Sequence, residues 1–234
     1  GINAHPQLQQ IKGFSEKGQK IYLTFDELEK IENTSFDREA LRNAKDWLII
    51  GCYIGQRVSD LLVLTSDNIK VRNGLELLEL TQKKTGKRVA LPLHSKVKEI
   101  LDRNNGQFPD KISSQKFNKH IKDICKDAEL NTPIMGGKMT KDEKTNMTRK
   151  KIDIYPKHEL VTTHICRRSF STNFYGDIPT SLLISITGHA TEQQFLEYIG
   201  KNQNDYAIQL ADYWSKEALQ AKKESQMQVL KNAN

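Results

Sequence analysis

The sequence predicts a mainly α-helical domain with a small antiparallel β-hairpin or sheet, an α+β fold. Apolar residues recur at the spacing of amphipathic helices through most of the chain. The one clear β signal is a pair of short apolar runs, GLELLELTQ and RVALPL, joined by the glycine-containing turn KKTGK. With 234 residues, the chain is long enough for one large domain or two small ones.

A capping box predicts the first helix. Residues 1–20 show no clear period, and we expect them to form a tail or linker. Thr24 is followed three residues later by Glu27, the spacing at which two side chains satisfy free amides at a helix N-terminus. Leu28 and Ile31 then supply the buried face of the helix.

Four more helices are predicted on either side of the hairpin. A helix over residues 35–53 comes first, and a short one begins at Arg57. Helices over residues 95–103 and 113–130 follow the hairpin.

The segment 136–151, GGKMTKDEKTNMTRKK, contains six basic and two acidic residues and almost no large apolar ones. This composition predicts a mobile loop or an exposed second hairpin. A solvated linker and a DNA contact carry equal weight as its role.

The chain is predicted to be helical again from Thr162, with a break at residues 176–179, where Pro179 suits a first helical position. Gly188 ends the next helix, and Thr191 caps a short helix that carries Tyr198. A last helix begins near Asn204, and its tail beyond about Lys222 is expected to fray. The apolar stripe of this helix consists of Tyr206, Leu210, Tyr213 and Trp214.

Charge and cysteine content narrow the functional classes. The net charge of +7 fits a polyanionic partner without identifying it. The chain has no apolar run of membrane-spanning length and no visible signal peptide, so we expect a cytoplasmic protein. Cys52, Cys125 and Cys166 lack metal-binding spacing and are expected to be small core residues in a reducing compartment.

Four residues of the C-terminal third have side chains suited to phosphoryl transfer. His164 and Arg167 are three apart, so a helix directs both the same way, and an arginine fork matches two phosphate oxygens. The helix break at Gly188 lets His189 and Tyr198 converge from two helices. Imidazoles move protons and a phenol can act as a nucleophile. Taken singly, each of these residues is more often structural.

Two earlier segments add positive charge. Arg57 opens a helix in GCYIGQRVSDLLVL, and Asp60 lies one turn later, where a carboxylate can orient a neighbouring basic side chain. The hairpin turn contributes Lys83, Lys84 and Lys87, and a lysine there can deliver a proton to a leaving oxygen.

The order of these motifs resembles the tyrosine recombinases, also called the phage integrase family, over residues 22–200. GQRVSDLLVL is similar to the first-arginine motif, with Asp60 where glutamate is often found. ELTQKKTGKRVALPL is similar to the lysine hairpin, in which Lys84 is the better match. THICRRSFST fits the HxxR box with Arg168 where histidine is frequent, and ITGHATEQQFLEYIG fits the GH-to-tyrosine box with Thr187 where leucine is common.

The resemblance implies a tyrosine-recombinase catalytic domain and an enzyme that breaks and rejoins DNA, a site-specific recombinase or integrase. It implies that Tyr198 attacks a phosphodiester to form a 3′-phosphotyrosyl link, while Arg57 and Arg167 stabilise the developing charge. No metal and no small-molecule cofactor are implied, because arginines supply the positive charge.

The resemblance also implies the proton-transfer groups. Lys84 is the general acid for the 5′-oxygen, and His164 takes the tyrosine proton or assists its transfer. His189 hydrogen-bonds a non-bridging oxygen. Further DNA contacts are expected from Lys83, Lys87, Arg88 and Arg168.

The implied partners are double-stranded DNA and other protomers in a synaptic tetramer, with no membrane. Residues 21–200 would form the catalytic domain, and residues 201–234 a helix and tail that pack on a neighbouring protomer or on their own domain. We expect the N-terminal core-binding domain usual in the family to be absent from this chain. A nucleoid-associated protein of prokaryotic, phage or mobile-element origin is implied.

Two alternatives have different consequences. A type IB topoisomerase shares this fold and site in the family picture but relaxes supercoils as a monomer. A DNA-binding regulator with an inactive site would leave the tyrosine without covalent chemistry.

Overall fold

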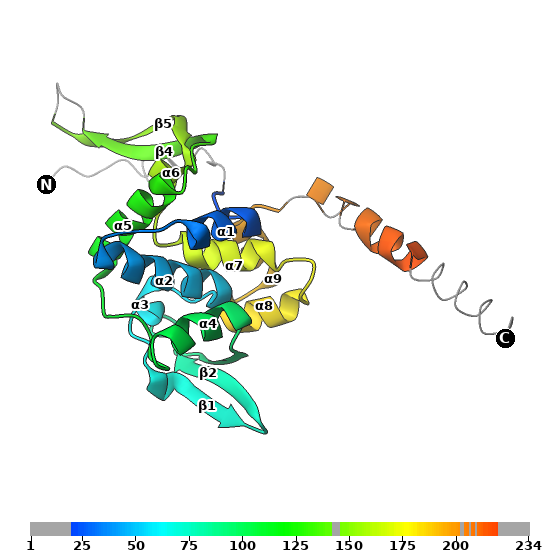
Figure 1. Cartoon of the computed structure of the whole chain (residues 1–234). Coiled ribbons are helices and arrows are strands. Elements are labelled where there is room, and N and C mark those ends of the chain that lie inside the picture. Colours follow the sequence, from blue (N-terminus) through cyan, green and yellow to red (C-terminus); the bar gives the residue numbers. More distant parts are fainter. Residues whose placement is uncertain (1–19, 142–145, 202–203, 206, 209, 220–234) are drawn as a thin grey trace, which may run out of the picture.

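The computed structural model describes residues 20–141, 146–201, 204–205, 207–208 and 210–219. Helices pack around the long helix α2 (Glu39–Ile54), with a three-stranded sheet at one end of the body and a two-stranded hairpin at the other (Figure 1). The predicted α+β class is confirmed. The predicted N-terminal tail up to residue 19, Tyr206 and the polar end beyond Lys222 lie outside the described residues.

The remaining named helices are α1 (Phe25–Asn33), α3 (Val58–Leu61), the 3-10 turn η2 (Ser66–Asn68), α4 (Ser95–Arg103), α5 (Ser114–Asp127), α6 (Lys157–Leu160), α7 (Ile165–Asn173), α8 (Thr180–Thr187) and α9 (Glu192–Ile199). All of these except η2 and α6 were predicted, and they occur in the predicted order. The capping box of Thr24 and Glu27 on α1 is confirmed. None of the helices in the described part of the chain is long and apolar enough to cross a membrane.

Helix α2 begins later than predicted, at Glu39 rather than near Ser35. Arg42 Nη1 donates to the carbonyls of Phe36 (2.9 Å) and Asp37 (2.6 Å), and these bonds turn the chain ahead of the helix. The hydrogen bonds of one arginine side chain therefore override the local helix signal.

Two smaller differences occur in the C-terminal half. The single turn α6 was not predicted, because four residues are too few to show a helical period. Pro179 was predicted to be the first residue of α8, but it is the N-cap of this helix, one position earlier.

The first sheet is antiparallel, in the order β1 (Ile69–Arg72), β2 (Leu75–Thr81) and β3 (Arg88–Pro92). The predicted hairpin is β2–β3, in which buried Leu78 lies opposite buried Leu91. Strand β1 was not predicted. Asn73 and Gly74, which form the two-residue turn between β1 and β2, could have indicated it. Both have positive φ, 51° and 76°, as a hairpin turn of this length requires.

Strands β4 (Pro133–Lys141) and β5 (Thr148–Pro156) form the second hairpin. Of the two alternatives for this segment, the exposed hairpin is confirmed, and its strands extend beyond residues 136–151. Gly136 lets the hairpin approach α6, since a Cβ there would lie 2.6 Å from Leu160 Cδ1. The pair Lys138–Glu159, at 2.7 Å, secures the same contact.

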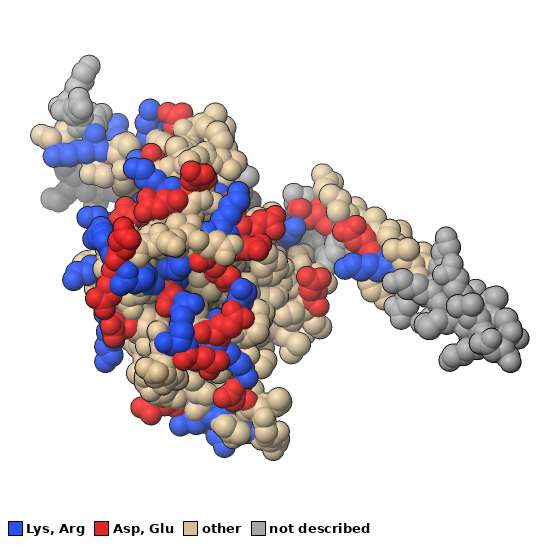
Figure 2. Space-filling view, in the orientation of Figure 1, with Lys and Arg blue, Asp and Glu red and all other residues tan. Residues whose placement is uncertain are grey.

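Charged side chains are unevenly distributed. Acidic and basic residues are intermixed over the helical body on the face drawn in Figure 2. The strands of the second hairpin carry Asp153 and five basic residues: Lys138, Lys141, Arg149, Lys150 and Lys151. The strands of this hairpin therefore carry an excess of positive charge.

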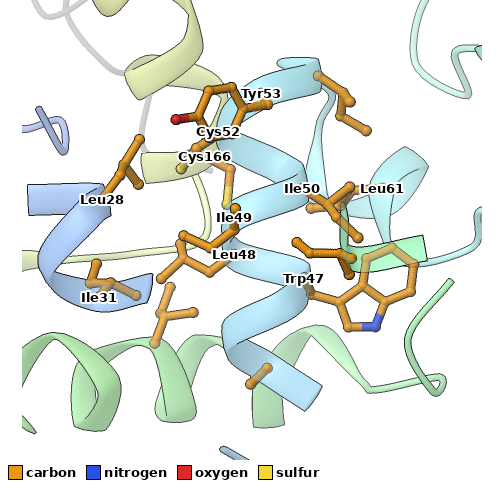
Figure 3. Close-up of a cluster of buried hydrophobic side chains, with 14 of the residues drawn as sticks. Leu28, Ile31, Trp47, Leu48, Ile49, Ile50, Cys52, Tyr53, Leu61 and Cys166 are labelled. Carbon is orange, nitrogen blue, oxygen red and sulfur yellow. The ribbon is translucent and has the colours of Figure 1, made fainter. Parts of the chain in front are cut away.

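The core is built on α2, whose Trp47 and Ile50 are fully buried (Figure 3). Gly51 allows α2 and α7 to cross closely, because a Cβ at this position would lie 2.7 Å from Leu61 Cδ2 and 2.8 Å from Cys166 Cβ. Cys52, Cys125 and Cys166 are free and buried, which confirms them as core residues. The α2–α7 contact brings the chain after α2 close to the HxxR segment.

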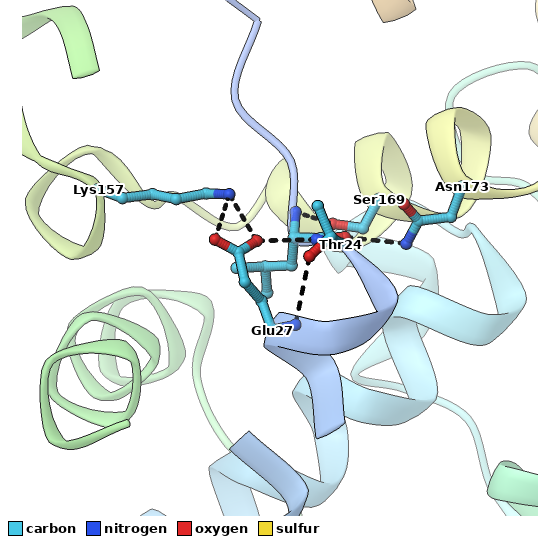
Figure 4. Close-up of polar contacts among 6 residues, drawn as sticks. Thr24, Glu27, Lys157, Ser169 and Asn173 are labelled. Carbon is cyan, nitrogen blue, oxygen red and sulfur yellow. Dashed lines mark hydrogen bonds and ion pairs between the residues drawn. The ribbon is translucent and has the colours of Figure 1, made fainter. Parts of the chain in front are cut away.

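Polar contacts fix the start of α1 on α7 and α6 (Figure 4). Leu23 donates its N–H to Ser169 Oγ (2.8 Å) and accepts from Asn173 Nδ2 (2.9 Å) through its carbonyl. Glu27 also binds Lys157 in a largely buried ion pair at 2.5 Å.

The predicted last helix is confirmed for the described residues between 204 and 219. It extends away from the body in Figure 1. The described members of its apolar stripe are exposed, Leu210 by 47%, Tyr213 by 65% and Trp214 by 60%.

Candidate active site

The tight turn at the end of α2 places Arg57. Gly55 ends the helix with a φ of 68°, and a Cβ there would lie 2.3 Å from the Phe170 ring, so only glycine fits. Arg57 follows as the N-cap of α3. Its side chain is half-buried, and Nη1 donates to Gln82 Oε1 at 3.3 Å.

Asp60 binds the main chain of the β2–β3 turn. It is 2% exposed, and Oδ1 accepts a hydrogen bond from the main-chain N–H of Lys83 (3.1 Å). Its negative charge also acts on Arg167 and raises the pKa of that guanidinium. The predicted role of Asp60, to hold or orient a neighbouring basic side chain, stays a prediction.

Main-chain bonds close the turn between β2 and β3. Gln82 N donates to the Lys87 carbonyl (2.9 Å), and Gly86 N donates to the Gln82 carbonyl (2.8 Å). Lys84 is exposed on this turn, and its positive charge contributes to lowering the pKa of His164. The other basic residues predicted here are also exposed: Lys83, Lys87 and Arg88.

Arg167 on α7 is only 3% exposed. Nη1 donates to the Gly55 carbonyl (3.3 Å) and Nη2 to the Thr187 carbonyl. Burial, and next the charge of Arg57, lower the pKa of Arg167 to about 10, so the guanidinium remains charged at neutral pH. The described hydrogen bonds of this buried cation are to neutral carbonyls, and the Asp60 carboxylate acts on it only through its charge. The guanidinium is therefore suited to an anionic ligand.

His164 is the N-cap of α7 and precedes the helix rather than lying in it. The residue is exposed. Partial burial and then the charges of Arg168 and Arg167 lower its pKa below the ordinary value of 6.5.

The break between α8 and α9 presents His189. Gly188 ends α8 with a φ of 66°. Thr187 Oγ1 donates to the Leu183 carbonyl (2.6 Å) and lies 2.9 Å from His189 Nδ1. A hydroxyl has one proton, so Thr187 accepts from Nδ1–H, and Nε2 of the neutral ring keeps its lone pair.

The electrostatic surroundings keep His189 neutral. Burial, and then the charges of Arg167 and Arg57, lower its pKa to about 4. The imidazole is therefore uncharged near neutral pH in the absence of an anion.

Tyr198 on α9 lies against the same groups. Its ring centroid is 5.0 Å from that of His189, 5.0 Å from Arg168 Cζ and 6.0 Å from Arg167 Cζ. The phenol O–H donates a long hydrogen bond to the His164 carbonyl (3.5 Å). Burial raises the pKa of Tyr198, and the neighbouring arginines act in the opposite direction.

The structure brings together Arg57, Arg167, His189, Tyr198 and the main chain of His164. Lys84 makes no described hydrogen bond to these residues. It acts on the site through its positive charge, which lowers the pKa of His164. Arg168 is half-buried, and its predicted contact with DNA stays a prediction. It stacks on the Tyr198 ring and donates to a carbonyl of the N-terminal segment.

Three polar residues beside the site were missed from the sequence. Gln56 and Gln82 are 1% and 0% exposed, and Thr187 is 0% exposed. The alternation of inward-facing and outward-facing residues along β2 could have identified Gln82. This residue falls on the buried face, two residues after Leu80. A polar side chain at such a position predicts a hydrogen-bonded network.

The described residues contain no group of three or more His, Cys, Asp or Glu side chains placed to hold a metal ion. Arg57 and Arg167 both bring positive charge to the site.

The fold and this arrangement of arginines, histidines and tyrosine define the catalytic domain of a tyrosine recombinase. The model of the phage integrase family matches residues 22–205, and the chain belongs to this family. No curated protein matches the chain.

Solved structures of similar fold include one recombinase and two integrases, each in complex with DNA. The XerH site-specific recombinase in a post-cleavage complex with a difH substrate has 18% identity and a TM-score of 0.55, over 84% of this chain and 54% of its own. A lambda integrase dimer bound to a COC′ core site has 20% identity and a TM-score of 0.57, over 85% and 66%. The Tn1549 transposon integrase with transposon right end DNA has 15% identity and a TM-score of 0.54, over 90% and 70%. The chain thus spans little more than half of XerH.

Proposed function

We propose that the protein is a site-specific DNA recombinase, or integrase, that cleaves and rejoins DNA strands through a 3′-phosphotyrosyl intermediate. One observation carries this proposal. The phenol of Tyr198 lies beside the buried guanidinium of Arg167, whose described hydrogen bonds are to neutral carbonyls, and beside the neutral ring of His189.

In the proposed reaction, the Tyr198 oxygen attacks phosphorus, the Tyr198 O–P bond forms, and the bond from phosphorus to the 5′-oxygen breaks. The phenol loses its proton and the 5′-oxygen gains one, so a 5′-hydroxyl leaves. The reverse attack by a 5′-hydroxyl restores the phosphodiester without an external energy source.

Arg57 and Arg167 stabilise charge on the non-bridging oxygens, a role worth several kcal/mol in comparable oxyanion sites. Support comes from the carbonyl partners of Arg167, which fix its guanidinium before DNA arrives. This preorganisation lowers the cost of reaching the transition state.

Proton transfer is assigned to three residues. Lys84 protonates the 5′-oxygen, and His164 accepts or relays the phenol proton. His189 contacts a non-bridging oxygen as an imidazolium, because its Nδ1–H is engaged with Thr187 and only a second proton, on Nε2, can be donated. The negative phosphate would raise its pKa from about 4 and favour this form.

The proposed partners are duplex DNA and further protomers in a synaptic tetramer. Affinity for DNA should fall steeply with salt, with contacts from Lys83, Lys87, Arg88 and, after rearrangement, Arg168. Residues 21–200 would form the catalytic unit, and the exposed stripe on residues 210–214 would pack on a neighbouring protomer. We place the protein at the nucleoid of a prokaryotic, phage or mobile-element host.

The test traps the covalent intermediate on DNA of any sequence, so the target site need not be identified first. The 234-residue protein is incubated with a pool of nicked duplexes of randomised sequence, and SDS-resistant complexes are recovered, sequenced and digested for peptide mass spectrometry. We expect the adduct on Tyr198. Tyr198→Phe should form none, and the control Tyr155→Phe, on the distant β5 strand, should react like the parent.

Absence of any adduct from the parent would favour an inactive DNA-binding regulator. Relaxation of supercoiled plasmid by isolated monomers, without pairing of two sites, would favour a type IB topoisomerase. An adduct on another residue would remove Tyr198 from the proposed role.

A further inference from the structure

Gln82 occupies the point where three parts of the candidate active site meet. Its side-chain amide is fully buried at the end of β2. Nε2 donates to Gln56 Oε1 (2.8 Å) and to the Ile186 carbonyl (3.0 Å). Oε1 accepts from Arg57 Nη1 (3.3 Å) and from Thr85 Oγ1 (2.9 Å).

These four bonds use the full donor and acceptor capacity of the amide and fix its orientation. Rotation by half a turn would direct the NH₂ group at the Arg57 guanidinium and the oxygen at the Ile186 carbonyl. Both contacts would then be repulsive. The orientation of Gln82 and the position of Arg57 are therefore coupled.

The same residue also controls the turn that carries Lys84. Its main-chain N–H and carbonyl close the turn through Lys87 and Gly86, at 2.9 Å and 2.8 Å, while its side chain holds Thr85. Lys84 lies within this closed turn, and its own side chain is exposed.

The third contact is with the break before His189. A Cβ at Gly188 would lie 2.2 Å from Gln82 Oε1, so α8 ends directly against the amide. Gln82 thus touches the segments that carry Arg57, Lys84 and His189.

The choice of an amide has an electrostatic consequence. A neutral oxygen positions Arg57 but leaves its full charge available to a phosphate, whereas a carboxylate would neutralise that charge. The acidic residue nearby, Asp60, binds the main chain of Lys83.

We propose that Gln82 is a positioning residue for strand cleavage: its buried amide holds Arg57, the Lys84 turn and the end of α8 in one arrangement, so that the arginine and the general acid reach the phosphate together. This inference rests on the proposed recombinase function.

The test measures single-turnover formation of the covalent complex on a nicked duplex recovered from the randomised pool. A second duplex carries sulfur in place of the 5′-bridging oxygen. Because a thiolate leaves without being protonated, this duplex bypasses the need for a general acid. Lys84→Ala should therefore be slow on the oxygen duplex and close to the parent rate on the sulfur duplex.

For Gln82→Ala we expect a loss of about 100-fold on the oxygen duplex, the scale of a misplaced catalytic group. At least about tenfold of this loss should be recovered on the sulfur duplex, and the rest reflects the loosened Arg57. Thr85→Val, which removes one exposed partner of the amide, should show the same pattern with a smaller loss. Gln107→Glu, a glutamine-to-acid change at an exposed site away from the turn, should react like the parent.

Equal losses on the two duplexes, or no loss with Gln82→Ala, would overturn the inference, since a merely structural role predicts no preference for sulfur. If circular dichroism shows that Gln82→Ala is unfolded, Thr85→Val decides by the same comparison. Failure of the parent protein to form any complex would instead count against the proposed function.

Discussion

Replacement of His189 by asparagine should make the stability of the protein less sensitive to acid. Asparagine is chosen because its Nδ2 can still donate to Thr187 Oγ1, as His189 Nδ1 does at 2.9 Å. The variant thus keeps the local hydrogen bond and removes only the titration of the ring.

The pKa of His189 gives the sign and size of the effect. It is about 4 in the folded protein, against an ordinary value of 6.5. Between these values the unfolded chain binds a proton that the folded protein does not, so acidification favours unfolding. Going from about pH 7 to about pH 5.5, His189 should lower the free energy of unfolding by about 1 kcal/mol.

Urea unfolding of the parent and His189→Asn at these two pH values measures the effect. His164 and His94 also have lowered pKa values, but they titrate in both proteins and cancel in the comparison. We expect the parent to lose about 1 kcal/mol more than the variant on acidification. Equal losses would refute the assignment of a neutral, half-buried His189.

Three further predictions concern Gly55, Arg167 and Glu27. Gly55→Ala should lower the free energy of unfolding by at least about 2 kcal/mol in urea, because φ is 68° and the new Cβ would meet the Phe170 ring at 2.3 Å; retention of stability would show that the turn relaxes. Arg167→Lys should slow covalent-complex formation by about 100-fold or more, since lysine cannot reach the carbonyls of both Gly55 and Thr187. A rate near the parent's would contradict the proposed role of the fixed guanidinium. Glu27→Gln should cost about 2 kcal/mol in thermal unfolding by leaving the buried Lys157 ammonium without a negatively charged partner, and an unchanged melting temperature would argue against that pair.

The sequence was sufficient for most helices because their signals are local. The capping box at Thr24 and the cap at Thr191 each join a side chain to a main-chain N–H three residues away. The β2–β3 hairpin was likewise visible from two apolar runs and a glycine turn. Such features are determined by residues that are close together in the sequence, so a short stretch is enough to predict them.

The contacts inside the candidate site were not predictable in the same way. Asp60 binds the N–H of Lys83, and the Gln82 amide meets the Ile186 carbonyl, across 23 and 104 positions. No local pattern encodes which buried donor will meet which acceptor at such separations. The proposed catalytic residues were found by a resemblance in motif order, whereas the residues that hold them in place required coordinates.

The separation of the site's segments along the chain affects the order in which they are synthesised. Arg57 and Arg167 come from the turn after α2 and from α7, but Tyr198 lies on α9, the last named helix. During synthesis from the N-terminus, both arginines therefore leave the ribosome before the proposed nucleophile does. A nascent or truncated chain that stops within α8 would possess the residues proposed to hold a phosphate and lack the residue proposed to attack it. Under the proposed function, incomplete copies of this protein would be unable to cut DNA.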